Sequence, residues 1–291
     1  MLRYAWLWFL VRVVGRAPDW FLMAAADLGG MLLWYASPRV RAVTTDHMRH
    51  VLGTLSTANE RTRAAKGCVR TAGRYYADFC RAPHRPTGAA FDELDAVEGL
   101  DRWFEALDRG CGLIVCSAHL GNPEFFVRAV GQLEIDLLVL TEPLSPPRVH
   151  RLVHEARAAR GVRFMPAGLS AVREAITHLK QGGVLAVLGD RDVLHNGRPT
   201  VFFDERARLP SGAVDLSLRT GAPILPVFVT RTPRGRYRVY IDEAFQVQRT
   251  GDHEADIEAG MRQVAAALET GIRRAPDQWF PLQPVWSGLA L

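Results

Sequence analysis

The hydrophobic pattern changes near residue 90 of the 291-residue chain. Up to about residue 80, apolar residues recur at the three-to-four-residue spacing of helices, and Pro18 and Pro38 stand at plausible breaks between helices. The stretch 82–90, APHRPTGAA, predicts a loop. Beyond it, short apolar runs alternate with helical stretches, which is typical of α/β proteins.

Five apolar runs predict strands: GLIVCSA (112–118), IDLLVLT (135–141), VLAVLGD (184–190), ILPVFVT (224–230) and RYRVYID (236–242). Helical patterns lie between them at 123–132, 147–160, 169–181, 210–220 and 254–274. Runs that are apolar throughout predict strands covered on both faces, whereas RYRVYID alternates and predicts an edge strand. We therefore expect a helical segment over 1–90 and, over 91–291, an α/β core with a mostly parallel central sheet flanked by helices.

The first 36 residues are unusually rich in aromatic side chains, since four of the seven tryptophans of the chain lie there. A spanning helix needs about 20 apolar residues, but Arg12, Arg16 and Asp27 interrupt the apolar runs. Tryptophan and arginine within apolar helices favour helices that lie at the membrane–water interface. A helical hairpin packed on the core of the protein itself remains the alternative.

The net charge and the cysteines limit the classes of ligand and the cellular compartment that suit the protein. The net charge of +5 and the pI of about 9.3 suit an anionic membrane or ligand, and no nucleic-acid recognition motif is present. The four cysteines form no CxxC pair or zinc spacing, and Cys111 and Cys116 flank an apolar run that predicts buried, reduced thiols. We expect a peripheral or monotopic protein at the cytoplasmic face of the inner membrane.

The first candidate catalytic residues follow the strand GLIVCSA. Asn122 is a good N-cap and Pro123 suits a first helical turn, so His119 would lie on the strand-to-helix loop with Glu124 within reach. A neutral imidazole can take a proton from a hydroxyl, and a carboxylate on its far nitrogen would fix the tautomer. Alternatively, Glu124 merely stabilises the helix dipole.

Charged residues mark two further places. Arg157, with Arg160 nearby, lies on a predicted helix, and arginine binds phosphate in a bidentate fork, although a solvated basic face is the alternative. Asp190, Arg191 and Asp192 end an apolar run, where charges are costly unless they are paired or functional. A structural ion-pair cluster is equally compatible, and a metal site is not expected.

Four motifs together resemble one family. The motifs are SAHLGNPE (117–124), Arg157 in EARAARG, the GDRD block at 189–192 followed by VFF at 201–203, and PDQWF (276–280) with QPVW (283–286). They stand in the order that is found in the late lipid A and phosphatidylinositol mannoside acyltransferases. This branch belongs to the H-x4-D/E lysophospholipid acyltransferases, so the resemblance implies a glycerol-3-phosphate acyltransferase-like fold.

The resemblance also implies the reaction. His119 with Glu124 would transfer a fatty acyl group from acyl-CoA or acyl carrier protein to a glycolipid or phospholipid hydroxyl, without another cofactor. The residues expected at the substrate are Asn122, Arg157, Arg160, Asp190, Arg191, Asp192, and Phe202 and Phe203 of the acyl pocket. A lipid A precursor, a mannosylated phosphatidylinositol and a lysophospholipid remain possible acceptors. A thioesterase or lipid hydrolase and a non-catalytic lipid-binding protein are the alternatives.

Overall fold

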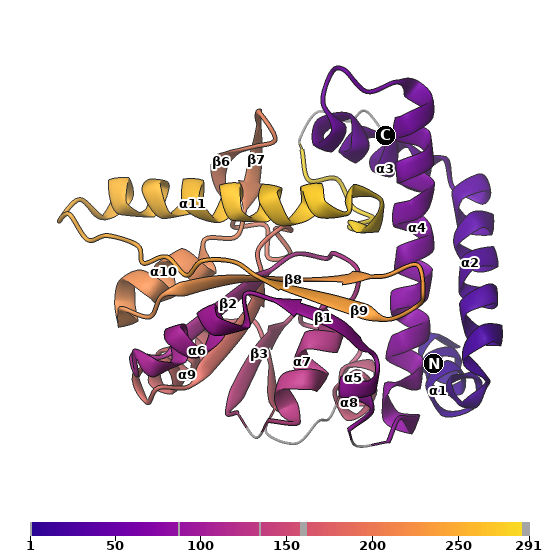
Figure 1. Ribbon diagram of the computed structural model, residues 1–291, viewed down its shortest axis with the longest axis horizontal. Coiled ribbons are helices and arrows are strands. Elements are labelled where there is room, and N and C mark those ends of the chain that lie inside the picture. The colour runs from indigo at the N-terminus through magenta and orange to yellow at the C-terminus, as the bar shows by residue number, and fades with distance from the viewer. Residues whose placement is uncertain (1, 87, 134, 158–161, 287–291) are drawn as a thin grey trace.

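The computed structural model describes residues 2–86, 88–133, 135–157 and 162–286. Its centre is a seven-stranded sheet with the strand order β1-β9-β8-β2-β5-β3-β4 (Figure 1). The strands are β1 (Leu94–Glu98), β2 (Leu113–Ser117), β3 (Leu137–Thr141), β4 (Val162–Pro166), β5 (Val184–Leu188), β8 (Ile224–Arg231) and β9 (Tyr237–Ile241). β8 and β9 pair antiparallel and the other neighbours pair parallel, which confirms the expected mostly parallel sheet.

Helices form the N-terminal part, as the sequence predicts: α1 (Leu2–Arg12), α2 (Asp19–Ala36), α3 (Pro38–Leu52) and α4 (Ala58–Arg81), with the short η1 (Val14–Arg16). Pro18 and Pro38 stand at the starts of α2 and α3, where a proline costs no helical hydrogen bond. A capping box of Thr57 and Glu60 begins α4. α2 lies along α4 at one flank of the molecule (Figure 1). Within the described residues, every helix is too short or too polar to cross a bilayer.

The remaining elements cover the sheet: α5 (Ala89–Asp92), α6 (Leu100–Asp108), α7 (Pro123–Gly131), α8 (Pro147–Arg157), α9 (Leu169–Lys180), α10 (Gly212–Thr220), α11 (His253–Arg274), η2 (Ala82–His84), η3 (Pro276–Gln278) and the hairpin of β6 (Arg198–Phe202) and β7 (Glu205–Leu209). Side chains of β2 alternate between two cores. Ile114 and Cys116 pack with α9, α10 and α11, whereas Leu113 and Val115 pack with α6 and α7. The expected burial of both sheet faces is therefore confirmed.

Two expectations are wrong in detail. β9 is not an edge strand, because β1 pairs along its outer side. Its polar residue Arg238 forms an ion pair with Asp95 of β1 instead of facing only water. Cys111 is exposed, although Cys116 is buried as expected.

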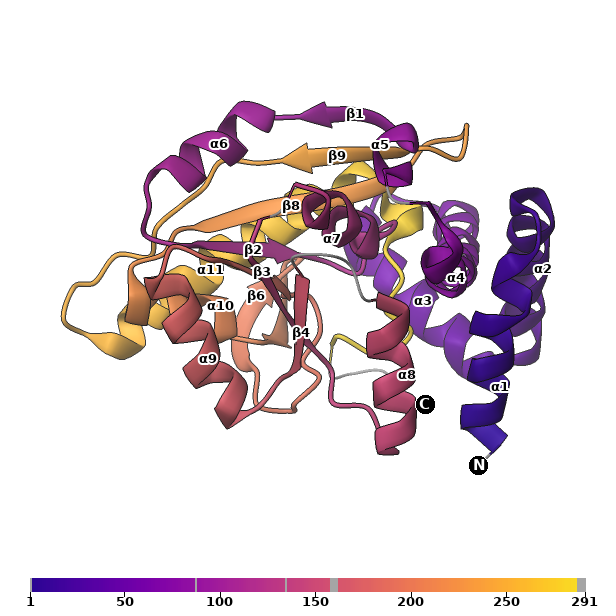
Figure 2. The ribbon, with the colours of Figure 1, turned by 90° about the horizontal axis from the view of Figure 1, so that it is seen from below.

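A third apolar cluster joins the N-terminal helices to the rest of the molecule. Val11 of α1, Phe79 and Cys80 of α4, and Val153 and Ala156 of α8 pack together. Figure 2, seen from below, shows α8 between the sheet and α1. The inner side of α1 is therefore part of the core, and α4 and α8 come together close to the carboxyl end of β2.

Candidate active site

The loop after β2 gives His119 its place. Asn122 caps α7 by accepting a hydrogen bond of 3.2 Å from the amide of Phe125, and Pro123 is the first helical residue, as the sequence predicts. Gly121 has a φ of +58°, and a Cβ there would lie 2.1 Å from the carbonyl oxygen of Val229. Only glycine fits this turn, which holds His119 at the carboxyl end of a central strand.

The imidazole of His119 is bound by Asp190. Nδ1 lies 2.8 Å from Oδ1 of Asp190, and the backbone amide of His119 donates to Oδ2 at 2.9 Å. The indole Nε1 of Trp279 donates to the same Oδ2 at 2.8 Å. β2 and β5 are paired neighbours, so the residues that follow their ends meet at one edge of the sheet.

Asp190 is completely buried, yet it remains a carboxylate. Burial alone would raise the pKa of Asp190, but the charge of His119 and the hydrogen bonds from His119 and Trp279 outweigh burial and lower the pKa below its usual value. The His119 side chain keeps 20% exposure. Among the described residues, its Nε2 has no hydrogen-bond partner. A neutral ring with Nδ1–H directed at Asp190 leaves Nε2 able to accept a proton.

Glu124 is directed elsewhere, which corrects the expected pairing with the imidazole. Its Oε1 lies 2.6 Å from a guanidinium nitrogen of Arg157 and accepts a hydrogen bond of 3.1 Å from the hydroxyl of Tyr75. The first turn of α7 thus points its acidic residue at α4 and α8. The carboxylate on the far nitrogen of His119 comes from Asp190.

Arg157 is held on several sides. Burial would lower the pKa of Arg157, but the charge of Glu124 and the contact with Tyr75 raise it above its usual value. The rings of Phe79 and Phe164 lie 5.7 and 5.9 Å from its guanidinium carbon. The sequence-predicted His119, Asp190, Glu124 and Arg157 therefore all lie around the carboxyl ends of the strands, in two hydrogen-bonded groups.

One aromatic ring separates these two groups. The ring centroid of Phe280 is 6.0 Å from that of His119 and 5.0 Å from that of Tyr75. The backbone amide of Phe280 also donates to the carbonyl oxygen of His119 at 2.9 Å. Phe280 therefore packs between the imidazole of His119 and the group formed by Tyr75, Glu124 and Arg157.

Comparisons with known proteins agree with this geometry. The family model described as bacterial lipid A biosynthesis acyltransferase matches residues 1–287. The chain belongs to this family. Two phosphatidylinositol mannoside acyltransferases of Mycobacterium tuberculosis, from strains H37Rv and CDC 1551, are each 27% identical to this acyltransferase over 221 residues, which cover 74% of this chain and 67% of theirs. The predicted family is thereby confirmed.

In this lipid A-type acyltransferase, Asn122 supports the fold of the site. Its amide nitrogen donates to Asp78 of α4 and to the hydroxyl of Tyr237, both at 3.0 Å. Arg231 forms an ion pair with the same Asp78 carboxylate, and Gln278 makes two hydrogen bonds to the backbone of Arg231. These contacts join α4, the sheet and the C-terminal segment behind the catalytic loop. They occupy the side chain of Asn122, which favours a structural role over contact with substrate.

Two other charged residues of the acyltransferase have local partners. Arg191 forms an ion pair with Glu142. Asp192 accepts hydrogen bonds of 3.1 and 2.8 Å from the amides of 196 and 197 and so shapes the loop before β6. In the described part of the chain, no three His, Cys, Asp or Glu side chains are grouped to hold a metal ion. Arg160 lies outside the described residues.

The two phenylalanines expected at the acyl pocket are buried. Phe202 stacks on Trp286 with centroids 5.6 Å apart, and Phe203 contacts Trp279. This packing favours a role in the core of the acyltransferase, and the expected acyl contact stays a prediction.

Sequence reasoning missed the roles of Tyr75 and Trp279. Tyr75 lies in a helix whose pattern shows only an amphipathic face, so no local signal distinguishes it. Trp279 belongs to the PDQWF motif, which carries the family resemblance without indicating what the indole binds. The structure shows that this motif completes the hydrogen bonding of Asp190.

Proposed function

We propose that the protein is a membrane-associated O-acyltransferase that moves a fatty acyl group from acyl-CoA or acyl carrier protein to a hydroxyl of a glycolipid or phospholipid. A mannosylated phosphatidylinositol or a lipid A precursor is the acceptor class that the family and the curated relatives favour. The observation that carries the proposal is the imidazole of His119, fixed through Nδ1 by buried Asp190 and open at Nε2.

His119 acts as the general base. Its Nε2 takes the proton of the acceptor hydroxyl as the oxygen attacks the thioester carbonyl carbon. Asp190 stabilises the imidazolium that forms. The carbon–sulfur bond then breaks, the imidazolium returns the proton to the leaving thiolate, and the products are an ester and a free thiol. These steps need no cofactor besides the acyl donor as co-substrate.

Arg157 holds negative charge of the substrate in this proposal. Acyl-CoA, acyl carrier protein and phospholipids all present phosphate, which a guanidinium binds well. Glu124 and Tyr75 fix the orientation of Arg157 from one side, so the role proposed for Glu124 is positional. Arg191 and Asp192 would then act at the border of the site, and a role of Arg160 stays a prediction.

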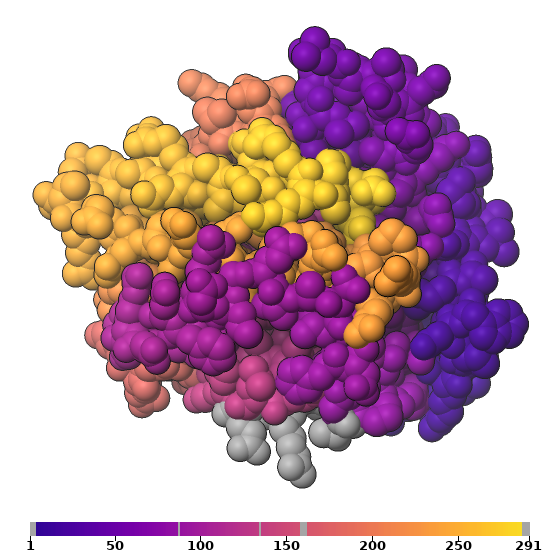
Figure 3. All heavy atoms as spheres, in the orientation of Figure 1, coloured from indigo at the N-terminus to yellow at the C-terminus, as the bar shows by residue number. Residues whose placement is uncertain are grey.

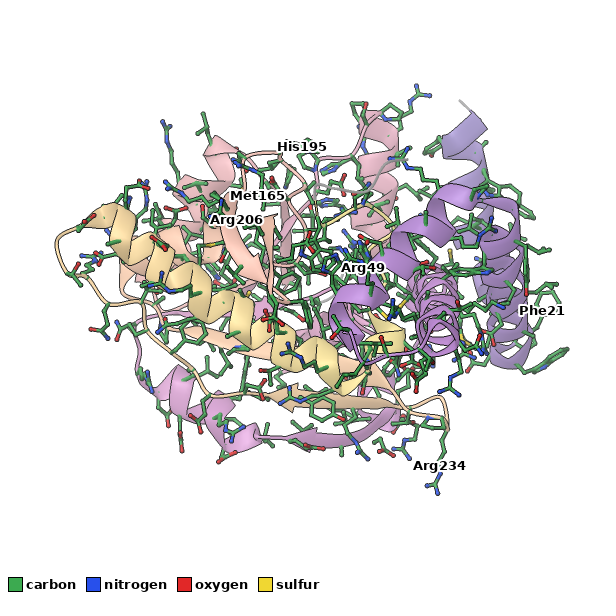
Figure 4. All side chains as sticks on the ribbon, turned by 90° about the horizontal axis from the view of Figure 1, so that it is seen from above. Phe21, Arg49, Met165, His195, Arg206 and Arg234 are labelled. Carbon is green, nitrogen blue, oxygen red and sulfur yellow. The ribbon has the colours of Figure 1, made fainter. Side chains whose placement is uncertain are left out.

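We place the protein at the cytoplasmic face of the inner membrane, with α1 and α2 on the lipid. Trp6 and Trp20 are 62% and 73% exposed, and Leu28, Leu32 and Tyr35 continue an exposed apolar stripe along α2. Figure 4 shows Phe21 pointing away from the molecule. These helices form the flank of the molecular surface in Figure 3. A contiguous exposed apolar face of this kind fits the interface of a bilayer.

Vesicle flotation tests the membrane contact. Trp20→Ser/Leu28→Ser/Leu32→Ser should weaken binding to phosphatidylinositol-containing vesicles by about 10- to 100-fold, because three large apolar side chains no longer enter the lipid. Leu55→Ser/Leu169→Ser/Val201→Ser removes exposed side chains from other elements and serves as the matched control. Equal loss in both triple variants would contradict a membrane face on α2.

Labelled palmitoyl-CoA tests the reaction. Thiol release that requires added membrane lipid and yields a labelled lipid supports the transferase. Release without lipid would indicate the alternative hydrolase, and binding without release a non-catalytic lipid-binding protein. His119→Ala should lower turnover by at least about 10³-fold, as expected when a general base is removed, while the protein stays folded. Full activity of this variant would exclude His119 as the base.

A further inference from the structure

A basic groove lies between α3 and α4, away from His119. Its volume is about 430 Å³, a size typical of small-ligand sites. One face of α3 and the start of α4 line it, with Pro38, Arg41, Ala42, Thr45, Asp46, Arg49 and Arg61. Figure 4, seen from the side on which α3 lies, labels Arg49 there. Three cationic side chains thus face one hollow.

The charges of this α3–α4 groove are not balanced. Arg49 forms an ion pair with Asp46 at 3.1 Å. Arg41 instead donates to the carbonyl oxygen of Trp34 at 3.2 Å, and Arg61 donates to the hydroxyl of Ser56 at 2.9 Å. Among the described residues, no carboxylate forms an ion pair with either of these two arginines. Arg49 also forms an ion pair with Glu205 at 3.6 Å, so both carboxylates here pair with Arg49. Three arginines and two carboxylates leave an excess of one positive charge, and Arg41 and Arg61 repel each other unless an anion binds between them.

We propose that the α3–α4 groove binds a phosphate group of one of the two substrates. Guanidinium groups with neutral partners on one side keep other N–H groups available for phosphate oxygens. The fixed partners Trp34 and Ser56 also hold the two arginines in place before the ligand arrives. This inference deepens the proposed acyltransferase function, on which it rests for the identity of the ligand.

The position of the groove suits a substrate that comes from a lipid surface. Trp34 lies in the last turn of α2, where Leu32, Leu33 and Tyr35 are exposed, and its carbonyl oxygen is the partner of Arg41. The groove therefore opens next to the end of the apolar face of α2. Phosphates lie at the border of apolar and aqueous layers in a membrane, so arginines at this border are well placed to bind them.

Two soluble probes distinguish the sources of the phosphate. We would measure the affinities of free CoA and of dihexanoyl phosphatidylinositol, below its micellar concentration, by calorimetry at low salt. Arg41→Gln/Arg61→Gln should weaken at least one affinity by about tenfold or more. Arg173→Gln/Arg234→Gln removes two exposed arginines elsewhere and should change both affinities less than about twofold. Arg41→Lys/Arg61→Lys keeps the charge and should retain part of the affinity.

Each outcome is decisive. Weaker binding of CoA alone assigns the groove to the acyl donor, weaker binding of the lipid alone assigns it to the acceptor, and weaker binding of both indicates a general phosphate site. Absence of probe binding by the unmodified protein, or equal affinities of the groove and control variants, would overturn the proposal. Because turnover is not measured, inactivity of the protein as an acyltransferase would leave this result readable on its own.

Discussion

Asp190 uses both carboxylate oxygens within the protein. Oδ1 faces Nδ1 of His119, and Oδ2 accepts from the backbone of His119 and from Trp279. A buried carboxylate with this many donors keeps its charge and a fixed position. In the mechanism that we propose, catalysis therefore depends on a side chain that need not touch the substrate itself.

Exchanging each of the two carboxylates separates their roles. Asp190→Asn should lower kcat by about 10³- to 10⁴-fold, because an amide no longer stabilises the imidazolium or fixes its tautomer. Glu124→Gln should act mainly on KM, by about tenfold, because it weakens the hold on Arg157. Steady-state kinetics with palmitoyl-CoA check both. A loss of kcat in Glu124→Gln together with a change of KM alone in Asp190→Asn would indicate that Glu124, and not Asp190, is the partner of the imidazole.

Removing one N–H group tests the part played by Trp279. In Trp279→Phe, Asp190 loses a donor, so more of its negative charge acts on His119 and stabilises the imidazolium. The acid limb of the kcat/KM profile should therefore move to higher pH, with an activity loss of about tenfold at neutral pH.

Trp286→Phe is the matched control for this change. Trp286 lies in the same aromatic cluster but donates to the carbonyl oxygen of Phe202. Its replacement should lower the free energy of unfolding without moving the pH profile. A shift of the pH profile of equal size in both variants would mean that Trp279 acts through its packing and not through its N–H group.

The sequence predicts these residues only as far as local signals reach. His119 and Asn122 stand out because a buried run, a cap and a proline follow one another within a dozen positions. Asp190 lies 71 positions from His119, and only the pairing of β2 with β5 brings them together. Glu124, five positions from His119, is nearer along the chain, but the first turn of α7 directs it away.

Among the elements, α4 connects the most distant parts of the site. Its capping box holds the start at Thr57, Tyr75 contacts Glu124 and Arg157, and Asp78 receives Asn122. On its other side it packs against α2 at close range. A shift of this helix would therefore disturb both Arg157 and the loop that carries His119.

Two glycines test the close packing of α2 on α4. In Gly73→Ala the new Cβ would lie 2.6 Å from the carbonyl oxygen of Ala26, so the helices must separate, at a cost of about 1–3 kcal/mol. Gly29 of α2 has open space around it, and Gly29→Ala should stabilise by about 0.4–1 kcal/mol. Urea unfolding measures both. Equal stability of the two variants would contradict the packing described.

Strand prediction succeeds where an apolar run is long or where polar and apolar residues alternate regularly. β2, β3, β5 and β8 were predictable from apolar runs and β9 from its alternation, whereas β1 and β4 have mixed polarity without either pattern. The β6–β7 hairpin turns at Phe203 and Asp204, which both have positive φ angles. An Asn-Gly or Asp-Gly pair would have indicated this turn, but Phe-Asp does not.

For the whole molecule, buried His47 makes stability depend on pH. Burial, and then the charge of His50, lower the pKa of His47 to about 3. In the unfolded chain a histidine takes up a proton near pH 6.5, whereas the folded protein leaves His47 neutral. Below that pH only the unfolded state gains the proton, so stability is present above pH 6.5 and is lost as the pH falls, by up to about 1.4 kcal/mol per pH unit.

His47→Phe measures this contribution. The ring of His47 lies against Trp279 and Trp286 and its Nε2 has no partner within the described structure, so phenylalanine should pack there without the titration. Urea unfolding at pH 7.5 and 5.0 should show a smaller loss of stability in this variant than in the unmodified chain. Exposed His253→Phe should leave the loss unchanged. A loss that is the same in all three proteins would place the proton uptake elsewhere.

The indole of Trp279 comes from far along the polypeptide. It lies 89 positions after Asp190, whose carboxylate it binds, and 160 positions after His119. Translation therefore produces His119 and Asp190 long before Trp279, the hydrogen-bond partner of Asp190, has been made. A nascent chain, or one cut before residue 279, would contain His119 and Asp190 without the hydrogen bond from the indole to Asp190. If our proposed mechanism holds, a nascent chain becomes competent for acyl transfer only after its C-terminal segment has been synthesised.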